Sequence, residues 1–216
     1  RDLHYPLRRQ RQMCIRDRDR DAPPSHHQVI IPEGSTWRYL DDGSNQGAAW
    51  RQPDFDHSAW ESGPAMLGYD TNQNTTFGTV ISYGGNASYK HITYYFRKDF
   101  EIENPDKFGD LNLKLMIDDG AVVYLNGHEV VRHNMPSGII SYTTEANVIV
   151  GTLDISYHSI PSSLLVNGTN TLAVEAHQCN RTSSDLRFDL ELWSQGRYLH
   201  TNFSISSSGE ELILTN

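Results

Sequence analysis

Apolar and polar residues alternate along several segments in the second half of the chain. Residues 111–117 carry Leu or Ile at every odd position, and residues 186–192 carry Leu or Phe at every even position. Because successive side chains of a β-strand point to opposite faces, this period of two predicts strands with one buried face. Segments rich in β-branched or aromatic residues predict further strands at 94–102, 148–155 and 171–176.

Two turn signals follow the first of these strands. Asp118-Asp119-Gly120 consists of turn-forming residues. Asn126-Gly127 is a pair that tight hairpins favour, because both of its positions need a positive φ. The apolar segment 121–125 lies between the two turns, and 128–132 follows the second. The pattern over 111–132 therefore predicts two consecutive hairpins.

Residues 41–91 are rich in Gly, Asn, Asp and Trp and show little alternation. Such a long loop is uncommon in a compact domain unless it has a function. We expect five of its apolar residues to anchor it to the rest of the fold: Trp50, Phe55, Trp60, Met66 and Leu67. A short helix is expected only around 159–165. Many short strands separated by Gly and Asn turns predict an all-β sandwich or barrel.

The hairpin Val122-Val123-Tyr124-Leu125-Asn126-Gly127-His128-Glu129-Val130 resembles a hairpin of galactose-binding-like jelly rolls, such as the sugar-binding domains of β-galactosidase-type hydrolases. Over 37–192 the chain is similar to an accessory domain of large secreted bacterial proteins. These proteins also carry lamin-tail, metallophosphatase or spore-coat-kinase-like modules. The resemblance implies a jelly-roll β-sandwich, although a fold does not fix an activity. Asp70 and His57 depart from the family pattern, which usually has Gly and Asp there.

Pattern and resemblance together divide the chain into three parts. Residues 1–28 have no strand or helix period and include a run of Arg and Asp, so we expect a disordered tail that is not native to the fold. Residues 29–196 are the expected sandwich. Residues 197–216 predict a linker and the truncated start of a following β domain, which resembles a lamin-tail module.

Charge and hydropathy exclude several classes of function. The 216 residues carry 18 Lys and Arg against 27 Asp and Glu, a net charge of −9. Because an acidic surface repels phosphate groups, we expect no nucleic-acid partner, whereas uncharged sugars and Ca²⁺ suit such a surface. No apolar run is long enough to span a bilayer. Cys14 lies in the tail and leaves Cys179 without a partner for an internal disulfide.

Asp118 and Asp119 are the first candidate site. Two adjacent carboxylates in a loop supply the oxygen ligands that Ca²⁺ prefers. A similar Asp-Asp-Gly precedes a strand in protective-antigen-type lectin modules, where it holds Ca²⁺ and a sugar. The alternative is an ordinary turn, since Asp and Gly commonly form turns. No other cofactor is expected.

His177, Gln178, Ser184 and Asp185 are the second candidate site. They lie at the two ends of one loop between predicted strands. A Ser-His-Asp hydrolase is one interpretation, but no Gly-x-Ser-x-Gly elbow surrounds the serine. A polar network that closes the loop is the favoured interpretation, and ligand binding by this network is a third.

Aromatic side chains in loop-like segments are the third candidate feature. Sugars stack their apolar faces on exposed rings, with polar groups alongside. This description fits Tyr69, Tyr83, Tyr89 and Tyr142, of which Tyr69 and Tyr83 enter the predicted ligand-binding set. Tyr124, Asn126 and Arg132 of the hairpin complete that set.

The combined prediction is a non-catalytic accessory module of a secreted or cell-surface multidomain protein. It would bind a glycan or space and orient the neighbouring domains of the same polypeptide. One alternative is a fragment of a secreted hydrolase, a phosphatase or glycosidase, whose catalytic domain lies outside this chain. Another is a Ca²⁺-binding, lectin-like module.

Overall fold

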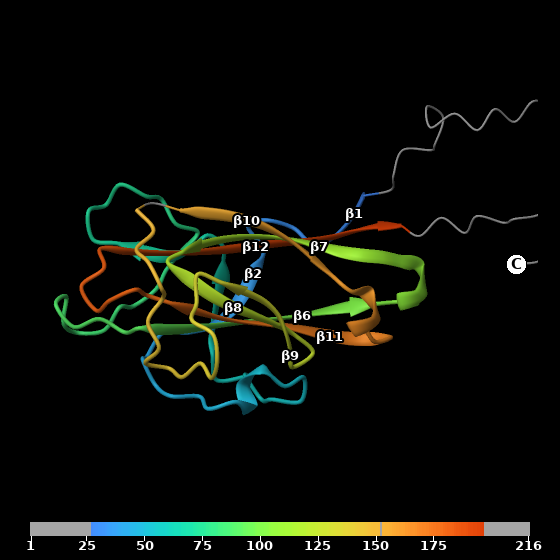
Figure 1. Cartoon of the computed structure of the whole chain (residues 1–216), viewed down its shortest axis with the longest axis horizontal. Coiled ribbons are helices and arrows are strands. Elements are labelled where there is room, and N and C mark those ends of the chain that lie inside the picture. The colour runs from blue at the N-terminus through green and yellow to red at the C-terminus, as the bar shows by residue number, and fades with distance from the viewer. Residues whose placement is uncertain (1–26, 152, 197–216) are drawn as a thin grey trace, which may run out of the picture.

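The computed structural model describes residues 27–151 and 153–196, and these form a β-sandwich (Figure 1). Their regular structure consists of twelve β-strands in two six-stranded sheets and three single-turn 3₁₀-helices. The prediction of an all-β sandwich is confirmed. None of the helices in the described ranges is long or apolar enough to cross a membrane.

Sheet A has the strand order β10-β7-β12-β4-β5, and β1 also pairs with β12. β12 pairs with β7 on one side; on its other side its first residues pair with β4 and its last residues with β1. All neighbours are antiparallel except β4 and β5. The bounds are β1 His27–Ile31, β4 Leu67–Asp70, β5 Thr79–Val80, β7 Phe108–Asp118, β10 Asp154–Ile160 and β12 Asp185–Gly196.

Sheet B has the order β3-β2-β6-β11-β8-β9, and all of its neighbours are antiparallel. Its bounds are β2 Thr36–Leu40, β3 Glu61–Pro64, β6 Thr93–Ile102, β8 Gly120–Leu125, β9 His128–His133 and β11 Gly168–His177. The 3₁₀-helices η1 (Ala49–Arg51), η2 (Pro105–Lys107) and η3 (Ser162–Leu164) lie in connections between strands.

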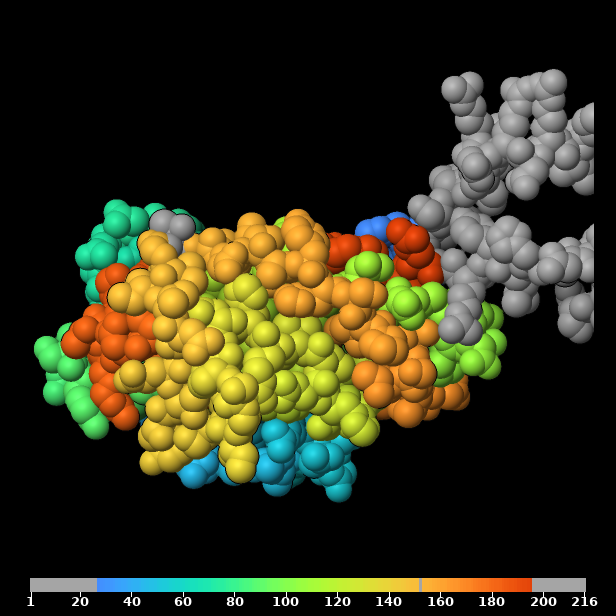
Figure 2. All heavy atoms as spheres, viewed as in Figure 1, coloured from blue at the N-terminus to red at the C-terminus, as the bar shows by residue number. Residues whose placement is uncertain are grey.

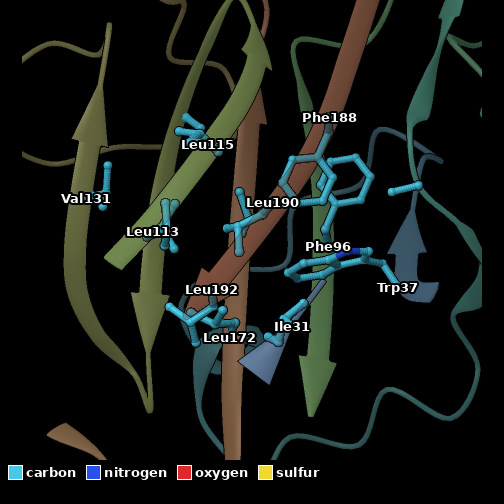
Figure 3. Close-up of a cluster of buried hydrophobic side chains, with 14 of the residues drawn as sticks. Ile31, Trp37, Phe96, Leu113, Leu115, Val131, Leu172, Phe188, Leu190 and Leu192 are labelled. Atoms are coloured by element: carbon cyan, nitrogen blue, oxygen red, sulfur yellow. The ribbon is translucent and has the colours of Figure 1, made fainter. Parts of the chain in front are cut away.

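The main core lies between the two sheets (Figure 3). The alternating apolar residues of β7 and β12 are fully buried here, as their period of two predicts. Aromatic rings join the sheets, because Phe188 of β12 packs on Phe96 of β6 at 4.2 Å and on Trp37 of β2 at 5.0 Å between ring centroids. Such ring pairs add to the stabilisation that burial provides.

A second apolar cluster covers the outer face of sheet B. Trp50 and Trp60 pack there against Tyr95 and Tyr124, with Phe55 at the margin. The predicted anchoring role of Trp50, Phe55 and Trp60 is therefore confirmed. Leu67 belongs instead to β4 and to the main core.

The predicted pair of hairpins is half wrong. β8 and β9 form the expected hairpin, with positive φ at both Asn126 (50°) and Gly127 (83°). β7 and β8, however, belong to different sheets, so Asp118-Asp119-Gly120 is a corner at which the chain crosses the sandwich. Both strands bury apolar side chains in the same core whether they pair directly or face each other, so alternation does not distinguish these arrangements.

Three further predictions need correction. The strand expected at 148–155 starts only at Asp154 and continues to Ile160. The expected helix at 159–165 is the single turn η3. Residues 41–91 contain three short strands, β3, β4 and β5. Their hydrogen-bond partners lie mostly far away in the sequence, so local pattern carries little of this information.

The predicted tail and the predicted lamin-tail start fall largely or wholly outside the described residues. β1 begins at His27, two residues before the predicted start of the sandwich at residue 29, and pairs with the end of β12.

Candidate functional site

Eight of the eleven predicted site residues lie towards one end of the sandwich. At this end the loops between β4 and β6, β9 and β10, and β11 and β12 gather (Figures 1 and 2). β1 begins and β12 ends at the opposite end (Figure 1). The eight residues are Tyr69, Tyr83, Asp118, Asp119, His177, Gln178, Ser184 and Asp185. These residues come together because β4, β7 and β11 end, and β12 begins, at this end of the sandwich.

A cavity of about 410 Å³ opens beside β4 and β5. Its walls combine aromatic and aliphatic side chains with short polar ones: Tyr69, Asp70, Thr71, Gln73, Thr75, Phe77, Val80, Ile81 and Tyr83. The rings of Tyr69 and Tyr83 are 5.1 Å apart. Both predicted tyrosines therefore line the same cavity.

Tyr69 has a different role from the one predicted. It lies on β4 and not in a loop, and it is only 2% exposed, so its ring contributes to the cavity floor. Its hydroxyl accepts a hydrogen bond from Gln178 Nε2 at 3.0 Å, and burial raises its pKa to about 12. Tyr83 is half-buried and presents the more accessible ring.

Arg187, which the sequence did not single out, organises the carboxylates behind this cavity. Its Nη2 lies 2.9 Å from Asp185 Oδ2 and 3.6 Å from Asp70 Oδ2, and its Nη1 lies 3.6 Å from Asp118 Oδ2. Nη2 also donates to Thr75 Oγ1 at 2.9 Å. One guanidinium thus lies against three carboxyl groups and fixes the loop that carries Thr75.

Asp70 is one of the two positions that depart from the pattern of the resembled family, and the structure gives it a local role. Its carboxylate accepts hydrogen bonds from the backbone N–H groups of Asn72 (2.8 Å) and Asn74 (3.1 Å). These bonds close the turn after β4, and the neighbouring residues Thr71, Gln73 and Thr75 line the cavity.

Asp118 and Asp119 are both buried at the corner between β7 and β8. Neither oxygen of Asp118 accepts a hydrogen bond from the described residues. Burial, together with the nearby charges of Asp185 and Asp119, raises the pKa of Asp118 to about 9. Asp119 instead accepts backbone N–H bonds from Val150 (2.6 Å) and Cys179 (2.9 Å) and ties two loops to the corner.

The described residues do not support the predicted calcium site. Within 27–151 and 153–196, no group of three or more His, Cys, Asp or Glu side chains could hold a metal ion. Asp119 uses its oxygens to bind backbone, and Arg187 provides the positive charge beside Asp118. A calcium ion takes six to eight oxygen ligands, so backbone carbonyls or water would have to supply those that the two carboxylates do not.

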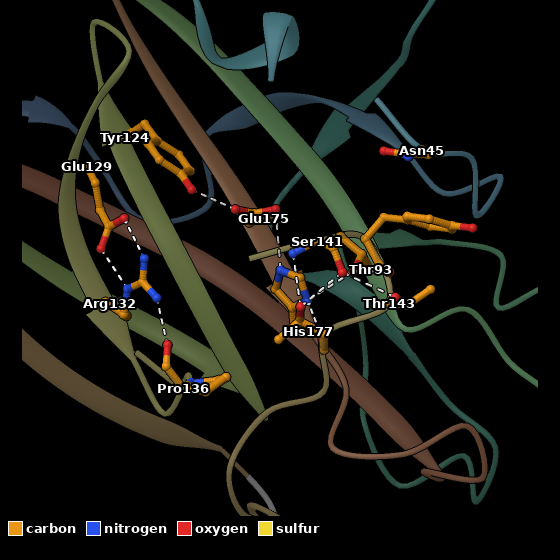
Figure 4. Close-up of polar contacts among 12 residues, drawn as sticks. Asn45, Thr93, Tyr124, Glu129, Arg132, Pro136, Ser141, Thr143, Glu175 and His177 are labelled. Carbon is orange, nitrogen blue, oxygen red and sulfur yellow. Dashed lines mark hydrogen bonds and ion pairs between the residues drawn. The ribbon is translucent and has the colours of Figure 1, made fainter. Parts of the chain in front are cut away.

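His177 ends β11 and is fully buried in a polar network (Figure 4). Its Nδ1 lies 2.9 Å from Thr93 Oγ1 and 2.8 Å from the carbonyl oxygen of Thr144, and its Nε2 lies 3.4 Å from Glu175 Oε2. Glu175 also accepts a hydrogen bond from the Tyr124 hydroxyl at 2.6 Å. The network fastens the loop between β9 and β10 onto sheet B.

No Ser-His-Asp triad forms among the described residues. Ser184 Oγ donates to Asp185 Oδ1 at 2.8 Å, and the hydrogen bonds of His177 go to Thr93 and Thr144. A nucleophile needs a base within hydrogen-bond reach and access to substrate, and a fully buried histidine has no such access. The triad hypothesis is therefore wrong for these residues. The structure supports the polar-network interpretation.

Gln178 directly follows β11 and connects it to Tyr69 of the cavity floor and to the start of β12. Its Nε2 donates to Tyr69 Oη and to the backbone oxygen of Asp185 at 2.6 Å, while its backbone N–H bonds to Ile92. It is fully buried, so it positions the cavity floor and does not contact a ligand directly.

Three predicted ligand-binding residues do not belong to the site. Tyr124 is buried beneath η1 on the outer face of sheet B. Asn126 occupies the β8–β9 turn, where its amide bonds to Leu164 and Asn170. Arg132 pairs with Glu129 and donates to carbonyl oxygens in the following loop (Figure 4). Each stabilises a turn or loop, which explains why the hairpin carries these residues.

Comparison with known proteins supports the architecture. Two similar solved structures are Bacteroides uniformis β-glucuronidase 2, covalently bound to cyclophellitol-6-carboxylate aziridine, and Bacteroides uniformis β-glucuronidase. Their TM-scores are 0.53 and 0.52, with 19% and 18% sequence identity, over 78% of this chain in each case. The chain shares its fold with one part of these enzymes.

The shared part is small, since this chain covers 18% of the length of each of these β-glucuronidases. At this level of identity the likeness establishes the fold and not the activity. No protein-family model matches the chain, and no curated protein matches it in sequence. The link to lamin-tail, metallophosphatase or spore-coat-kinase-like modules stays a prediction of the sequence.

Proposed function

We propose that this chain is a non-catalytic, glycan-binding accessory domain of a larger protein that acts on carbohydrates. The observation that carries the proposal is the cavity in which Tyr83, Phe77 and the floor residue Tyr69 face short polar side chains. Sugar rings present apolar C–H faces and peripheral hydroxyls, and such a mixed wall matches both. Its volume of about 410 Å³ lies in the range of small-ligand pockets.

Two further observations support the proposal. The fold is that of one part of β-glucuronidases, which makes a carbohydrate-active parent protein the natural setting. The net charge of −9 favours an uncharged ligand over a polyanion. A secreted or cell-surface location, expected from the family resemblance, belongs to the same proposal.

The test is direct binding to the full chain. Isothermal titration with neutral β-1,4-linked gluco-, galacto-, manno- and xylo-oligosaccharides should reveal at least one ligand. Tyr83→Leu keeps an apolar side chain against Tyr69 but removes the ring, and should weaken binding by about two- to tenfold, the stacking contribution of one aromatic group. Tyr157→Leu is the matched control, because Tyr157 is 67% exposed and does not line the cavity.

Binding that Tyr83→Leu leaves unchanged would place the ligand elsewhere. Absence of binding to every oligosaccharide tested would contradict glycan binding. It would favour the alternative that the domain spaces and orients its neighbours. Turnover of these oligosaccharides by the isolated chain would contradict the non-catalytic role. A catalytic part of the parent protein outside these residues is compatible with the proposal.

A further inference from the structure

A second cavity lies next to the first at the same end of the sandwich. Its volume is about 310 Å³. It is formed by the loop before β10 and by the loop that leads into β12: Ile149, Val150, Gly151, Asn180, Thr182, Ser183, Ser184 and Asp185. No residue is shared between the two linings.

The two cavities meet across a single pair of neighbouring strands. Asp70 of β4 lies opposite Asp185 of β12 in the antiparallel register. The next residue, Thr71, donates to the Ser184 backbone oxygen through its N–H (2.9 Å) and through its hydroxyl (3.0 Å). Asp70 and Thr71 line the first cavity, and Ser184 and Asp185 line the second.

The order of strands places the cavities side by side across the sheet. Sheet A runs β7-β12-β4-β5 in this region. The first cavity lies on the β4 and β5 side. The second lies where the 149–151 segment is tied to Asp119, next to β7. The Asp70–Asp185 pair therefore lies between the two cavities, which form the two lobes of the candidate groove.

The lobes differ in chemistry in a way that suits successive sugar units. The lining of the first includes the aromatic side chains of Tyr69, Phe77 and Tyr83. In the second, the hydroxyls of Thr182, Ser183 and Ser184 all donate within their own loop. Each hydroxyl oxygen keeps lone pairs that can accept from a ligand. The second lobe is thus rich in acceptors, which match the hydroxyl donors of a sugar.

We propose that the site binds an uncharged oligosaccharide of two or more units, with one ring in the aromatic lobe and the next in the acceptor lobe. This inference rests on the proposed function and names the class of ligand: an extended chain rather than a terminal monosaccharide. Ile149, which is 70% exposed, supplies the apolar contact for the second ring.

A length series separates this inference from simple sugar binding. The probes are the homologous β-1,4-linked neutral oligosaccharides of one to four units, measured by isothermal titration and, for weak ligands, by ligand-observed NMR. Affinity should rise at least about tenfold from one unit to three. Ile149→Ala should remove much of that gain, at least about threefold, because it removes the apolar carbons that the second ring would cover on binding. It should leave monosaccharide binding unchanged.

Ile139→Ala is the matched control. Ile139 lies in the same connection between β9 and β10, is 97% exposed and lines neither cavity. Backbone amide spectra give a second readout, since the trimer should shift the signals of Ser183 and Ser184 and the monosaccharide should not.

Equal affinity for all lengths, or the same loss with Ile149→Ala for monomer and trimer, would overturn the two-lobe groove while glycan binding itself stands. Absence of binding at every length would instead count against the proposed function. Trimer-dependent shifts confined to residues of the first cavity would also overturn the inference.

Discussion

Asp118→Asn tests the electrostatics of the corner between β7 and β8. The Asp118 side chain is almost completely buried, its oxygens accept no hydrogen bond from the described residues, and Arg187 Nη1 lies 3.6 Å away. Burial and the neighbouring Asp185 and Asp119 raise its pKa from 3.8 to about 9. At neutral pH the folded protein therefore holds this group protonated, while the unfolded chain releases the proton.

The sign of the pH effect follows from this difference. Between the unfolded pKa of 3.8 and the folded pKa of about 9, the folded state binds more protons than the unfolded state. Stability contributed by the group is complete below the lower pKa and is lost as pH rises towards the upper one. One proton corresponds to about 1.4 kcal/mol per pH unit as an upper limit. Because interaction with neighbouring charges broadens the titration of a buried group, we expect about 1 kcal/mol per pH unit.

Urea denaturation of the wild-type protein and of Asp118→Asn, at several values between about pH 6 and about pH 8, measures this slope. The wild type should lose roughly 2 kcal/mol of unfolding free energy across this range relative to Asp118→Asn. The reason is that Asn resembles the neutral acid but cannot ionise. Taking the difference removes contributions from other groups such as His158, whose pKa is lowered by burial and by His133.

Asp110→Asn is the control, since Asp110 lies on the same strand with an exposed side chain. It should follow the wild-type curve. Parallel curves for Asp118→Asn and the wild type would refute the reasoning, because they would mean that Asp118 is already ionised in the folded protein.

Three other predictions concern residues for which the structure shows a role that differs from the predicted one. Tyr124→Phe removes the 2.6 Å bond to buried Glu175 and should cost about 1–3 kcal/mol in urea denaturation, yet leave oligosaccharide affinity unaltered; a loss of affinity would return Tyr124 to the binding site. Asn126→Gly keeps the positive φ of 50° but loses the amide bonds, so thermal melts should show a smaller loss for it than for Asn126→Ala; equal losses would mean that backbone conformation is unimportant there. Calcium at millimolar concentration, compared with a chelator, should not shift the melting temperature, and a clear rise would restore the metal site at Asp118 and Asp119.

Part of the candidate site could be predicted from the sequence, because its residues lie close together along the chain. His177, Gln178, Ser184 and Asp185 could be grouped because they flank one loop. Arg187 was not foreseen, although it faces Asp185 across one intervening residue of β12, as alternation would have allowed. Its partners Asp70 and Asp118 come from strands that lie beside β12 only in the folded sheet.

The amino-acid sequence determined the class of fold, because the alternation in β7 and β12 and the Asn126-Gly127 turn are local properties of the chain. Tertiary structure alone decided that β7 and β8 lie in opposite sheets and that β3, β4 and β5 exist within residues 41–91. It also decided that Tyr124 points into a covered cluster. Alternation shows which face of a strand is buried. The choice of partner depends on hydrogen bonds and packing between segments as distant as Leu67 and Phe188, which form only when the whole sandwich closes.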